Sequence, residues 1–398
     1  METGPGRARR VGRAHRRGHG RRHLRRLPVP RPRGRRVLRA LERRLGGGAP
    51  RLRRPRRVPQ GAQGPESRSD PHGQRIERPR LGPGPARQSP HVRRRPRRLQ
   101  APARGRVKGR VRVSVPATTS NLGPGFDVLG MALSLRMTAV VEALPEGPRT
   151  PPAKDDLVSR SFWLALPPAR RPAAVRIAVA SEIPPARGLG SSAAARLCGV
   201  LAAAALDGWK THSFDDAVAL VAALEGHPDN TVPAAYGGLR SVLMDRGVPL
   251  HAAWPVPKGL AVALCVPGYE AATPKMRAAL PKNVPLHDAA ANAARVAHLL
   301  ACLKDGRLGE LRAAMADALH QPYRAKHLPG FREAVSAAEK AGAYGAALSG
   351  SGSTVLAFCP AGRAQSRVAA AMARAYARRG IASRPLCVSV DPKGALVS

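Results

Sequence analysis

The stretch Ile183-Pro-Pro-Ala-Arg-Gly-Leu-Gly-Ser-Ser-Ala-Ala-Ala195 decides the fold, because it joins a predicted strand to a predicted helix through a glycine loop. Residues 175–180 alternate apolar and polar side chains, which predicts a strand that the two prolines end. The alanine-rich run to Ala205 predicts a helix beginning near Ser191. Glycines between them let the backbone turn tightly and approach a ligand. A loop that directs its N–H groups and a helix N-terminus to one point is typical of a phosphate site.

Two common phosphate loops do not fit this stretch. No Gly-Lys-Ser/Thr ending is present, which excludes the P-loop pattern, and the glycines lack the G-x-G-x-x-G spacing of dinucleotide-binding folds. Taken alone, the stretch could equally be an ordinary loop followed by a helix with a serine N-cap. The rest of the chain has to decide between the two interpretations.

Positive charge is concentrated at one end of the chain. The 398 residues carry a net charge of +43, and residues 1–110 hold 36 of the 68 Lys and Arg but only five of the 25 Asp and Glu. Such basicity would ordinarily suggest a nucleic-acid partner. Here it is a property of the N-terminal quarter rather than of the part predicted to fold.

Residues 1–106 contain no Phe, Tyr or Trp and are rich in Arg, Pro and Gly. They cannot bury enough apolar surface to offset their ordering entropy, so we expect a disordered segment. It could be a nucleic-acid-binding arm, a transit peptide, or a stretch translated from GC-rich DNA upstream of the true start. We favour the third interpretation, because Arg without Lys is what GC-rich codons encode, and we expect the true start near Val107 or Val111.

The five cysteines are scattered and form no C-x-x-C pair. This pattern predicts reduced thiols in a cytoplasmic protein, with neither a zinc site nor a disulfide framework. No apolar run approaches the roughly 18 residues of a membrane helix, and no signal-peptide core follows Met1, so no membrane association is expected.

A second motif lies upstream of the glycine loop. Val111–Val115 alternates as a strand does, and Pro116-Ala-Thr-Thr-Ser-Asn-Leu-Gly-Pro-Gly-Phe-Asp127 follows it. The Gly-Pro-Gly run predicts a fixed turn that presents the amide of Asn121 and the carboxylate of Asp127. The alternative is that Asp127 merely caps a helix or loop. Residues 133–142 then resume a strand pattern.

Downstream of the glycine loop, residues 214–224 show helical spacing and end in Glu225-Gly-His-Pro-Asp-Asn230. Glu225 could ligate a metal or cap the helix, and His227 could be a ligand or a surface residue. Thr273 and Arg277 are four residues apart and share one face if that segment is helical.

The last third of the chain combines predicted helices with a second glycine loop. Helical patterns cover 287–303, 308–319, 331–341 and 365–380, while strand patterns cover 260–266 and 386–390. Arg324 follows the second of these helices. Ser349-Gly-Ser-Gly352 is a further ligand-approach loop leading into an apolar strand. Because strands and helices interleave throughout, the predicted class is α+β.

Together the motifs at 116–127, 184–194 and 348–354 resemble those of the GHMP kinase superfamily, and the first, with Glu-Gly-His-Pro-Asp-Asn, is similar to homoserine kinases within it. The resemblance covers about residues 107–398. It implies a two-domain kinase that uses ATP and Mg²⁺, with the site between the domains. Residues 107–258 would form an ATP-binding N-terminal domain with a ribosomal-protein-S5-like fold, and 259–398 a ferredoxin-like C-terminal domain. Small kinases of this type are often homodimers, which makes a homodimer the expectation.

The resemblance also implies the site residues. Ser192 and Glu225 match magnesium ligands, a donor pair that suits a hard cation. Those two residues and Asn230 are the expected catalytic residues. The phosphate-binding residues would be Pro184, Pro185, Ala186, Arg187, Gly188, Leu189, Gly190, Ser191, Ser192 and Ala193. The substrate contacts would be Asn121, Asp127, Asn230, Thr273, Arg277 and Arg324, with Ser349, Gly350, Ser351 and Gly352 forming the loop of the third motif.

The chemistry of the implied substrate, L-homoserine, fits this set. Asp127 can pair with its ammonium group, and Arg277 and Arg324 can hold its carboxylate, since Arg suits bidentate recognition. Asn230 stands where some relatives place an aspartate, and an amide cannot accept a proton, so no strong base is expected. Phosphoryl transfer tolerates this, because its loose transition state depends on positioning and charge neutralisation. Assistance by His227 or Asp229 stays open.

Two departures from the superfamily pattern stand out. Ser353 replaces the usual proline, and Thr119-Ser120 replaces the usual Ser-Ala. We expect neither change to touch a residue assigned to chemistry. The alternative functions are a kinase for another small alcohol, such as mevalonate or shikimate, and a nucleic-acid-binding protein acting through residues 1–106.

Overall fold

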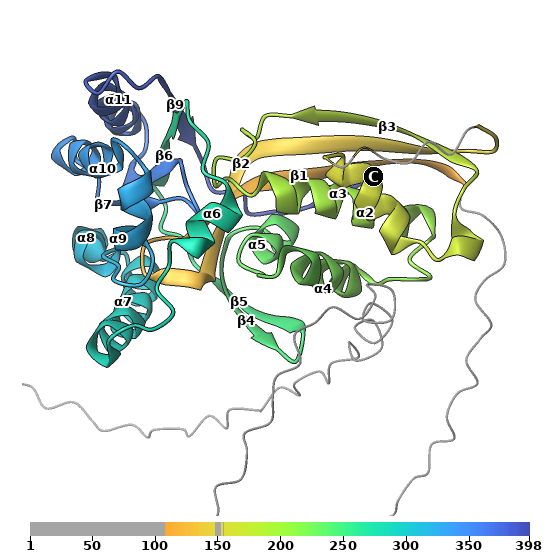
Figure 1. The fold of residues 1–398 in the computed structure, drawn as a ribbon, viewed down its shortest axis with the longest axis horizontal. Coiled ribbons are helices and arrows are strands. Elements are labelled where there is room, and N and C mark those ends of the chain that lie inside the picture. The colour runs from red at the N-terminus through yellow and green to blue at the C-terminus, as the bar shows by residue number, and fades with distance from the viewer. Residues whose placement is uncertain (1–107, 148–152, 154) are drawn as a thin grey trace, which may run out of the picture.

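Two antiparallel sheets organise the computed structural model, which describes residues 108–147, 153 and 155–398 (Figure 1). The expectations for residues 1–106 lie outside the described residues. Helices and strands alternate along the described chain, so the predicted α+β class is confirmed.

The first sheet has six strands in the order β10-β1-β2-β4-β5, with β3 also paired to β2. β1 and β2 are far longer than the two predicted strands, because the residues of the first motif continue their pairing up to a turn at residues 122–124. The register shifts next to Pro116, as expected for a proline inside a strand. The strands are β1 (Gly109–Asn121), β2 (Gly125–Leu144), β3 (Ala174–Ser181), β4 (Leu239–Asp245), β5 (Val248–Trp254) and β10 (Leu396–Val397).

Four helices accompany this sheet: α2 (Leu157–Ala165), α3 (Ser191–Leu206), α4 (Phe214–Glu225) and α5 (Thr231–Tyr236). α3 is the central one, with Ala193 to Ala204 almost wholly buried. Small side chains let α2 approach it closely: a Cβ at Gly199 would lie 2.2 Å from the Val158 carbonyl oxygen. The helix and the entering strand that the glycine loop predicted are both present.

The second sheet has four strands in the order β7-β8-β6-β9. Its chain order, strand–helix–strand–strand–helix–strand, is that of the expected ferredoxin-like domain. The amphipathic helices α10 and α11 pack against it, and Figure 1 shows them together at the end of the molecule away from β3. The elements are β6 (Leu260–Pro267), α6 (Thr273–Ala278), α7 (Leu286–Asp305), α10 (Phe331–Lys340), β7 (Gly345–Leu348), β8 (Val355–Pro360), α11 (Arg363–Ala377) and β9 (Ser383–Val388).

The helix predicted over 308–319 was wrong in its extent. The chain forms short pieces instead, because the Asp317 carboxylate accepts hydrogen bonds from the backbone N–H groups of Leu319, His320 and Gln321. A side chain that binds nearby backbone in this way competes with helical hydrogen bonding. Within this range the pieces are η2 (Leu308–Glu310) and α8 (Leu311–Ala314). After it come α9 (Gln321–Arg324) and η3 (Ala325–His327), and a further 3₁₀ turn, η1 (Pro168–Arg170), precedes β3.

The C-terminal end of the chain returns to the first sheet. β10 pairs with β1, and the backbone of Ser398 exchanges hydrogen bonds of 2.7 and 2.9 Å with Arg112. Arg136 of β2 holds this tail through an ion pair with Asp391 and a 2.8 Å hydrogen bond to the Gly394 carbonyl. The segment that we placed in the C-terminal domain therefore ends as a strand of the N-terminal sheet.

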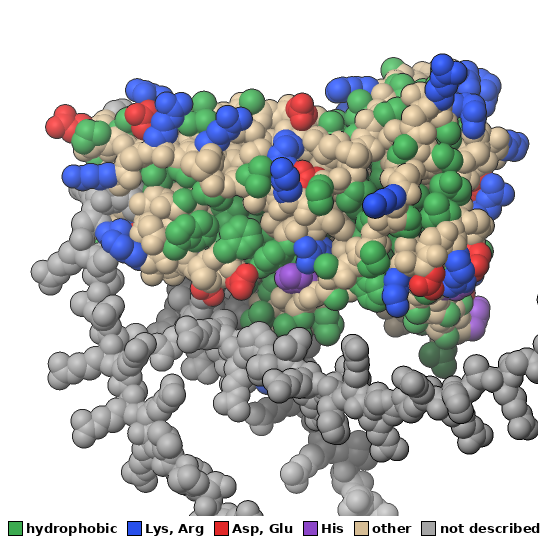
Figure 2. Space-filling view, turned by 180° about the vertical axis from the view of Figure 1, so that it is seen from behind, with side chains coloured by type: hydrophobic (Ala, Val, Ile, Leu, Met, Phe, Trp, Pro, Cys, Tyr) green, Lys and Arg blue, Asp and Glu red, His purple; other side chains and the backbone are tan. Residues whose placement is uncertain are grey.

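Surface charge on the described part is mixed. Figure 2 shows basic and acidic side chains scattered over the face opposite to that of Figure 1, with basic ones the more common. All five cysteines are free. Among the described helices, none combines the length and apolarity that crossing a membrane requires.

Candidate active site

A cleft of about 930 Å³ collects residues from every motif. It is bounded by the turn between β1 and β2, the start of α3, the segment after α4, helix α6 and the third motif. Of the expected site residues, the cleft is lined by Asn121, Asp127, Pro185, Ala186, Gly188, Gly190, Ser191, Ser192, Glu225, Asn230, Thr273, Arg277, Arg324, Gly350 and Ser351. It is not lined by Pro184, Arg187, Leu189, Ala193, Ser349 or Gly352.

The glycine loop fits tightly between the two sheets. Gly188 and Gly190 have positive φ angles of 74° and 68°, and a Cβ at Gly190 would lie 1.9 Å from the Thr118 hydroxyl oxygen. Gly190 is the N-cap of α3 and brings no side chain to cap it. The first N–H groups of a helix have no partner within it, so this end of α3 faces the cleft as an anion-binding terminus.

Ser192 and Glu225, the two expected magnesium ligands, lie in contact with each other. The Ser192 hydroxyl donates to Glu225 Oε1 over 2.6 Å, although the two residues are 33 positions apart. A residue that the sequence analysis missed joins them: Arg196 Nε lies 2.5 Å from the same carboxylate oxygen. Arg196 follows Ser192 by four residues on α3, which is the signal that could have found it. The hydroxyl and the carboxylate form a donor set suited to a hard cation.

Asn230 is held in one orientation at the end of the segment after α4. Its Oδ1 accepts a 2.8 Å hydrogen bond from the Thr118 hydroxyl, and its Nδ2 donates to Ser120 Oγ over 3.1 Å. Our expectation that the Thr119-Ser120 change touches no residue assigned to chemistry was wrong, because Ser120 contacts Asn230 directly. The twist of β1 brings this hydroxyl to the cleft, a placement that its sequence position alone does not give.

His227 and Asp229 form a close pair beside Asn230. His227 Nδ1 lies 2.5 Å from Asp229 Oδ1, and Asp229 is buried. Burial disfavours the charged imidazole, but the hydrogen bond and the negative charge of Asp229 outweigh it, so the pKa of His227 is raised above its ordinary value. His227 lines the cleft, with 14% of its side chain exposed.

Asp127 is already paired in this structure. Arg277 Nη1 and Nη2 donate to its two carboxylate oxygens over 3.0 and 2.8 Å, in the bidentate geometry typical of Arg. Asn121 Oδ1 accepts from the Asp127 backbone N–H over 3.1 Å and fixes the turn. Phe126, which the sequence analysis did not single out, lies beneath the Arg277 guanidinium with 5.5 Å between ring centre and Cζ.

Arg324 is the largest fully buried side chain of the described residues, with 2% of its surface exposed. Its Nη1 donates to the Gly350 carbonyl over 3.0 Å and lies 3.2 Å from His320 Nδ1. Burial, together with the nearby Arg277, lowers the pKa of Arg324 to about 10, so the guanidinium still carries its charge at neutral pH. Burial also lowers the pKa of His320, whose neutral ring can donate from Nε2 to the Gly123 carbonyl, 2.8 Å away.

The third motif connects the two sheets and completes the cleft. The Ser349 hydroxyl, itself buried, donates to the Gly188 carbonyl over 2.7 Å and can accept from the Thr119 hydroxyl, 2.8 Å away. The Ser351 hydroxyl lies 3.1 Å from that of Thr273. This loop therefore sets the position of the glycine loop, and only its Gly350 and Ser351 face the cleft.

The cleft thus has two chemically different ends. One end has the uncapped N-terminus of α3 with the Ser192–Glu225 pair, which suits an anion and a hard cation. The other end has two guanidinium groups and a carboxylate, which suit a small zwitterion. Such an arrangement can hold a phosphate donor and a charged acceptor together.

Family models and curated proteins agree on what this chain resembles. The GHMP kinase N-terminal domain model matches residues 156–238, and the GHMP kinase C-terminal model matches 299–378. A homoserine kinase of Thermus thermophilus is 42% identical over 258 residues, which is 63% of this chain and 87% of that protein. A homoserine kinase of Moorella thermoacetica is 41% identical, covering 68% of this chain and 93% of that protein.

Solved structures extend the likeness to three dimensions. A homoserine kinase from Cytophaga hutchinsonii matches with a TM-score of 0.65 and 28% identity, over 73% of this chain and 98% of that one. A mevalonate kinase of L. major, 17% identical with a TM-score of 0.56 over 74% of this chain and 99% of that one, shares the fold alone. With its relatives covered almost end to end and its motifs gathered at one cleft, the chain belongs to the homoserine kinases, a family of GHMP kinases.

Proposed function

We propose that this chain transfers the γ-phosphoryl group of ATP to the hydroxyl group of L-homoserine, giving O-phospho-L-homoserine and ADP for threonine biosynthesis. The observation that carries the proposal is the single cleft in which the uncapped start of α3 and the Ser192–Glu225 pair lie opposite Arg277 and Arg324. We place the reaction in the cytoplasm and expect a homodimer.

The ATP phosphates would lie against residues 184–193, where the backbone N–H groups at the start of α3 supply hydrogen bonds and the positive end of the helix dipole. Ser192 and Glu225 would hold Mg²⁺, which neutralises phosphate charge when bound. Arg196 keeps the Glu225 carboxylate in place beside Ser192.

The amino-acid end of the substrate would lie at the other end of the cleft. Arg324, anchored through Nε and Nη1, offers a buried positive charge to its carboxylate. Asp127 would pair with the ammonium group of the substrate. That group would then compete with Arg277 for the Asp127 carboxylate. Arg277 is half exposed, so it can turn from Asp127 towards the substrate carboxylate at little cost.

Proton transfer needs no strong base in this arrangement. Asn230 is locked by Thr118 and Ser120 and would orient the acceptor hydroxyl. The His227–Asp229 pair, in which the pKa of His227 is raised, lines the same cleft. Positioning and charge neutralisation then supply most of the rate enhancement.

A kinase for another small alcohol is the alternative that the fold permits. Mevalonate has no ammonium group, so Asp127 would have no partner in it, whereas homoserine occupies all three charged groups of the cleft end. With mevalonate Asp127 would keep only its pairing with Arg277, so the further ion pair with the ammonium group favours the amino acid.

The test is turnover by the purified full chain with ATP and, in parallel, L-homoserine, mevalonate and shikimate, with Mg²⁺ present or chelated. We expect turnover of L-homoserine alone, dependent on Mg²⁺. Glu225→Gln should lower kcat by at least about 100-fold, as expected for loss of a charge-neutralising group. Glu333→Gln, an exposed change on α10, is the matched control and should retain full activity. Turnover of mevalonate or shikimate instead would overturn the substrate and keep the kinase.

A further inference from the structure

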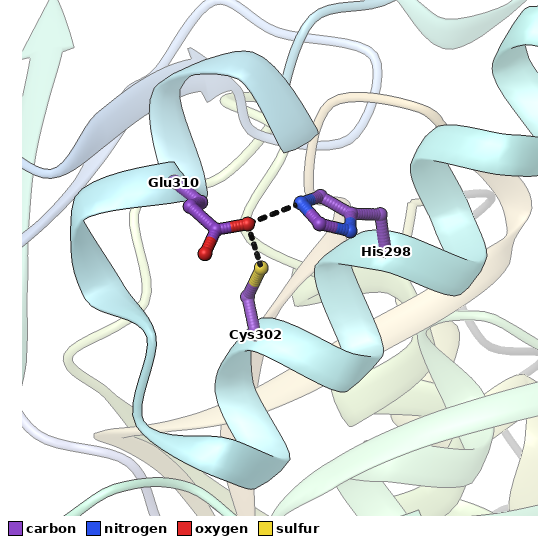
Figure 3. Close-up of side chains that lie close together, drawn as sticks. All are labelled: His298, Cys302 and Glu310. Carbon is purple, nitrogen blue, oxygen red and sulfur yellow. Dashed lines mark hydrogen bonds and ion pairs between the residues drawn. The ribbon is translucent and has the colours of Figure 1, made fainter.

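Three potential metal ligands meet outside the cleft lining, at the end of α7 (Figure 3). His298 Nε2 lies 2.7 Å from Glu310 Oε2, and Cys302 Sγ lies 3.8 Å from the same oxygen. The three ligand atoms are all within 4.8 Å of one another. None of these residues lines the cleft, so their arrangement is independent of the proposed kinase chemistry.

The local fold explains the meeting. His298 and Cys302 are four residues apart on α7 and therefore share one face of the helix. α7 ends at Gly306, whose φ of 74° reverses the chain, and the Gly306 and Arg307 N–H groups both bond the Cys302 carbonyl. The 3₁₀ turn η2 then carries Glu310 back over the helix. The backbone structure thus fixes the relative positions of His298, Cys302 and Glu310.

We propose that His298, Cys302 and Glu310 bind a divalent cation of the zinc type, with a fourth position left for water. One imidazole, one thiolate and one carboxylate form a mixed donor set that zinc accepts and that calcium and magnesium do not favour. Zinc lies about 2.0–2.3 Å from such ligands, which places tetrahedral ligand atoms roughly 3.3–3.7 Å apart. The N–O and S–O distances of 2.7 and 3.8 Å are on either side of that spacing, so small side-chain movements suffice.

The surroundings are compatible with loading from solvent. Cys302 is buried, while the side chains of His298 and Glu310 are 43% and 46% exposed, so an ion can enter on their side. Arg307 Nη1 contacts both Glu310 oxygens at 2.8 and 2.9 Å, and it can keep Oε1 while Oε2 turns to the ion.

The expected role is structural. The ion would join the end of α7 to η2, and the same helix carries Asn292, whose Nδ2 donates over 2.6 Å to the Pro124 carbonyl in the turn between β1 and β2. This proposal departs from our expectation of no zinc site, which rested on the missing C-x-x-C pair. Here a single cysteine is joined by His298, one helical turn away, and by Glu310, which follows the chain reversal at Gly306.

The test is titration of the metal-free full chain with Co²⁺, whose bond to a thiolate gives an absorption band in the near ultraviolet. We expect one band that saturates at one equivalent, and a rise of several degrees in melting temperature when Zn²⁺ replaces Co²⁺. Cys302→Ser and His298→Ala should each abolish the band and the rise. The buried Cys302→Ser variant could fail to fold. His298 is half exposed, so we expect His298→Ala to fold and to test the site in that case.

Two variants control for other sites. Cys387→Ser removes the exposed cysteine, and His287→Ala removes an exposed histidine that is paired with Asp288 on the same helix. Both should retain the band. Absence of a thiolate band in the parent protein would overturn the proposal, as would a band that survives both Cys302→Ser and His298→Ala. A second group of potential ligands in the cleft, Asp127, His227 and Asp229, includes no thiol. Co²⁺ bound there would therefore give no thiolate band.

Discussion

At the scale of single residues, Arg324 shows how burial changes what a charge can do. Its guanidinium is removed from water and anchored by the Gly350 and Met276 carbonyls. A buried charge that keeps one direction free is a strong site for a carboxylate, because water competes weakly with it.

The first prediction concerns this side chain. Arg324→Lys keeps the charge but loses the planar fork, and we expect kcat/KM for L-homoserine to fall about 10- to 100-fold, from a loss of roughly 1.5–3 kcal/mol. The KM for ATP should change little. Steady-state kinetics with each substrate varied in turn measure both values. Arg374→Lys, an exposed change on α11, is the matched control. An equal loss in both substrates would contradict a role specific to the acceptor.

The second prediction concerns pH and the His227–Asp229 pair. Because the pKa of His227 is raised in the folded protein, its charged form stabilises the fold fully below its unfolded pKa. That contribution disappears as pH rises through the folded pKa. His227→Gln should therefore lose more unfolding free energy near about pH 5 than near about pH 9, where the imidazole is neutral in both states.

Urea unfolding of the parent and of His227→Gln across this range gives the difference directly. His287→Gln is the control, since its ring is exposed beside Asp288 and solvent screens the pair. A difference that grows with rising pH would show that the sign of the shift in pKa is wrong.

At the scale of elements, the start of α3 depends on glycine for two separate reasons. Gly190 has a left-handed backbone, and it also lies where a side chain would meet Thr118. Gly306 at the end of α7 has nearly the same backbone, with φ of 74°, but a Cβ there would find no atom within 4 Å. An alanine at Gly306 would therefore add backbone strain alone, whereas an alanine at Gly190 would add both strain and a clash.

The third prediction uses this pair. Gly306→Ala should destabilise the protein by about 1–2 kcal/mol, the usual cost of a left-handed non-glycine residue. Gly190→Ala should cost roughly 1–3 kcal/mol more, because overpacking adds to the strain, and it should also weaken ATP binding. Urea unfolding and nucleotide titration test the two effects. Equal destabilisation by both changes would contradict the predicted clash with Thr118.

At the scale of the whole molecule, the returning C-terminal tail joins the end of the chain to its first described strands. Arg136 and Asp391, which are 21% and 11% exposed at their side chains, form the ion pair that holds it. Arg176 and Glu142 form a comparable pair on β3 and β2, but with side chains 70% and 38% exposed. Because solvent screens exposed charges, the two pairs should differ in strength.

The fourth prediction is a double-mutant cycle on each pair. Arg136→Met and Asp391→Asn should show a coupling energy of about 1–3 kcal/mol, as expected for neighbours that share a network. Arg176→Met and Glu142→Gln should couple by less than about 1 kcal/mol. Chemical denaturation measures both cycles. Equal coupling would mean that burial of the first pair adds nothing.

The fifth prediction concerns the basic segment. Of the residues that the structure describes, those lining the cleft run from Ser120 to Ser351, so we expect a chain that starts at Val107 to retain its kinetic constants for ATP and L-homoserine. If the full chain binds DNA, that binding should weaken steeply with salt and be lost on truncation. Loss of kinase activity in the shortened chain would show that residues 1–106 take part in the reaction.

The sequence by itself determined the α+β class, the glycine loop between strand and helix, and the kinase motifs. These follow from local physics: alternation, glycine spacing and helix propensity act over a few residues. The pairing of Ser192 with Glu225 was also foreseeable, but only through the resemblance. The true length of β1 and β2 was not foreseeable, because the first motif, which we interpreted as a turn, also pairs across the sheet.

Only the tertiary structure decided which side chains meet. Burial of Arg324, the lock of Thr118 and Ser120 on Asn230, and the pairing of Asp127 with Arg277 join residues that lie tens to hundreds of positions apart. The same holds for Glu310 returning to His298 and Cys302. Sequence patterns report the backbone that each segment prefers. The contacts depend on how twisted strands and a chain reversal pack those segments, which no local pattern encodes.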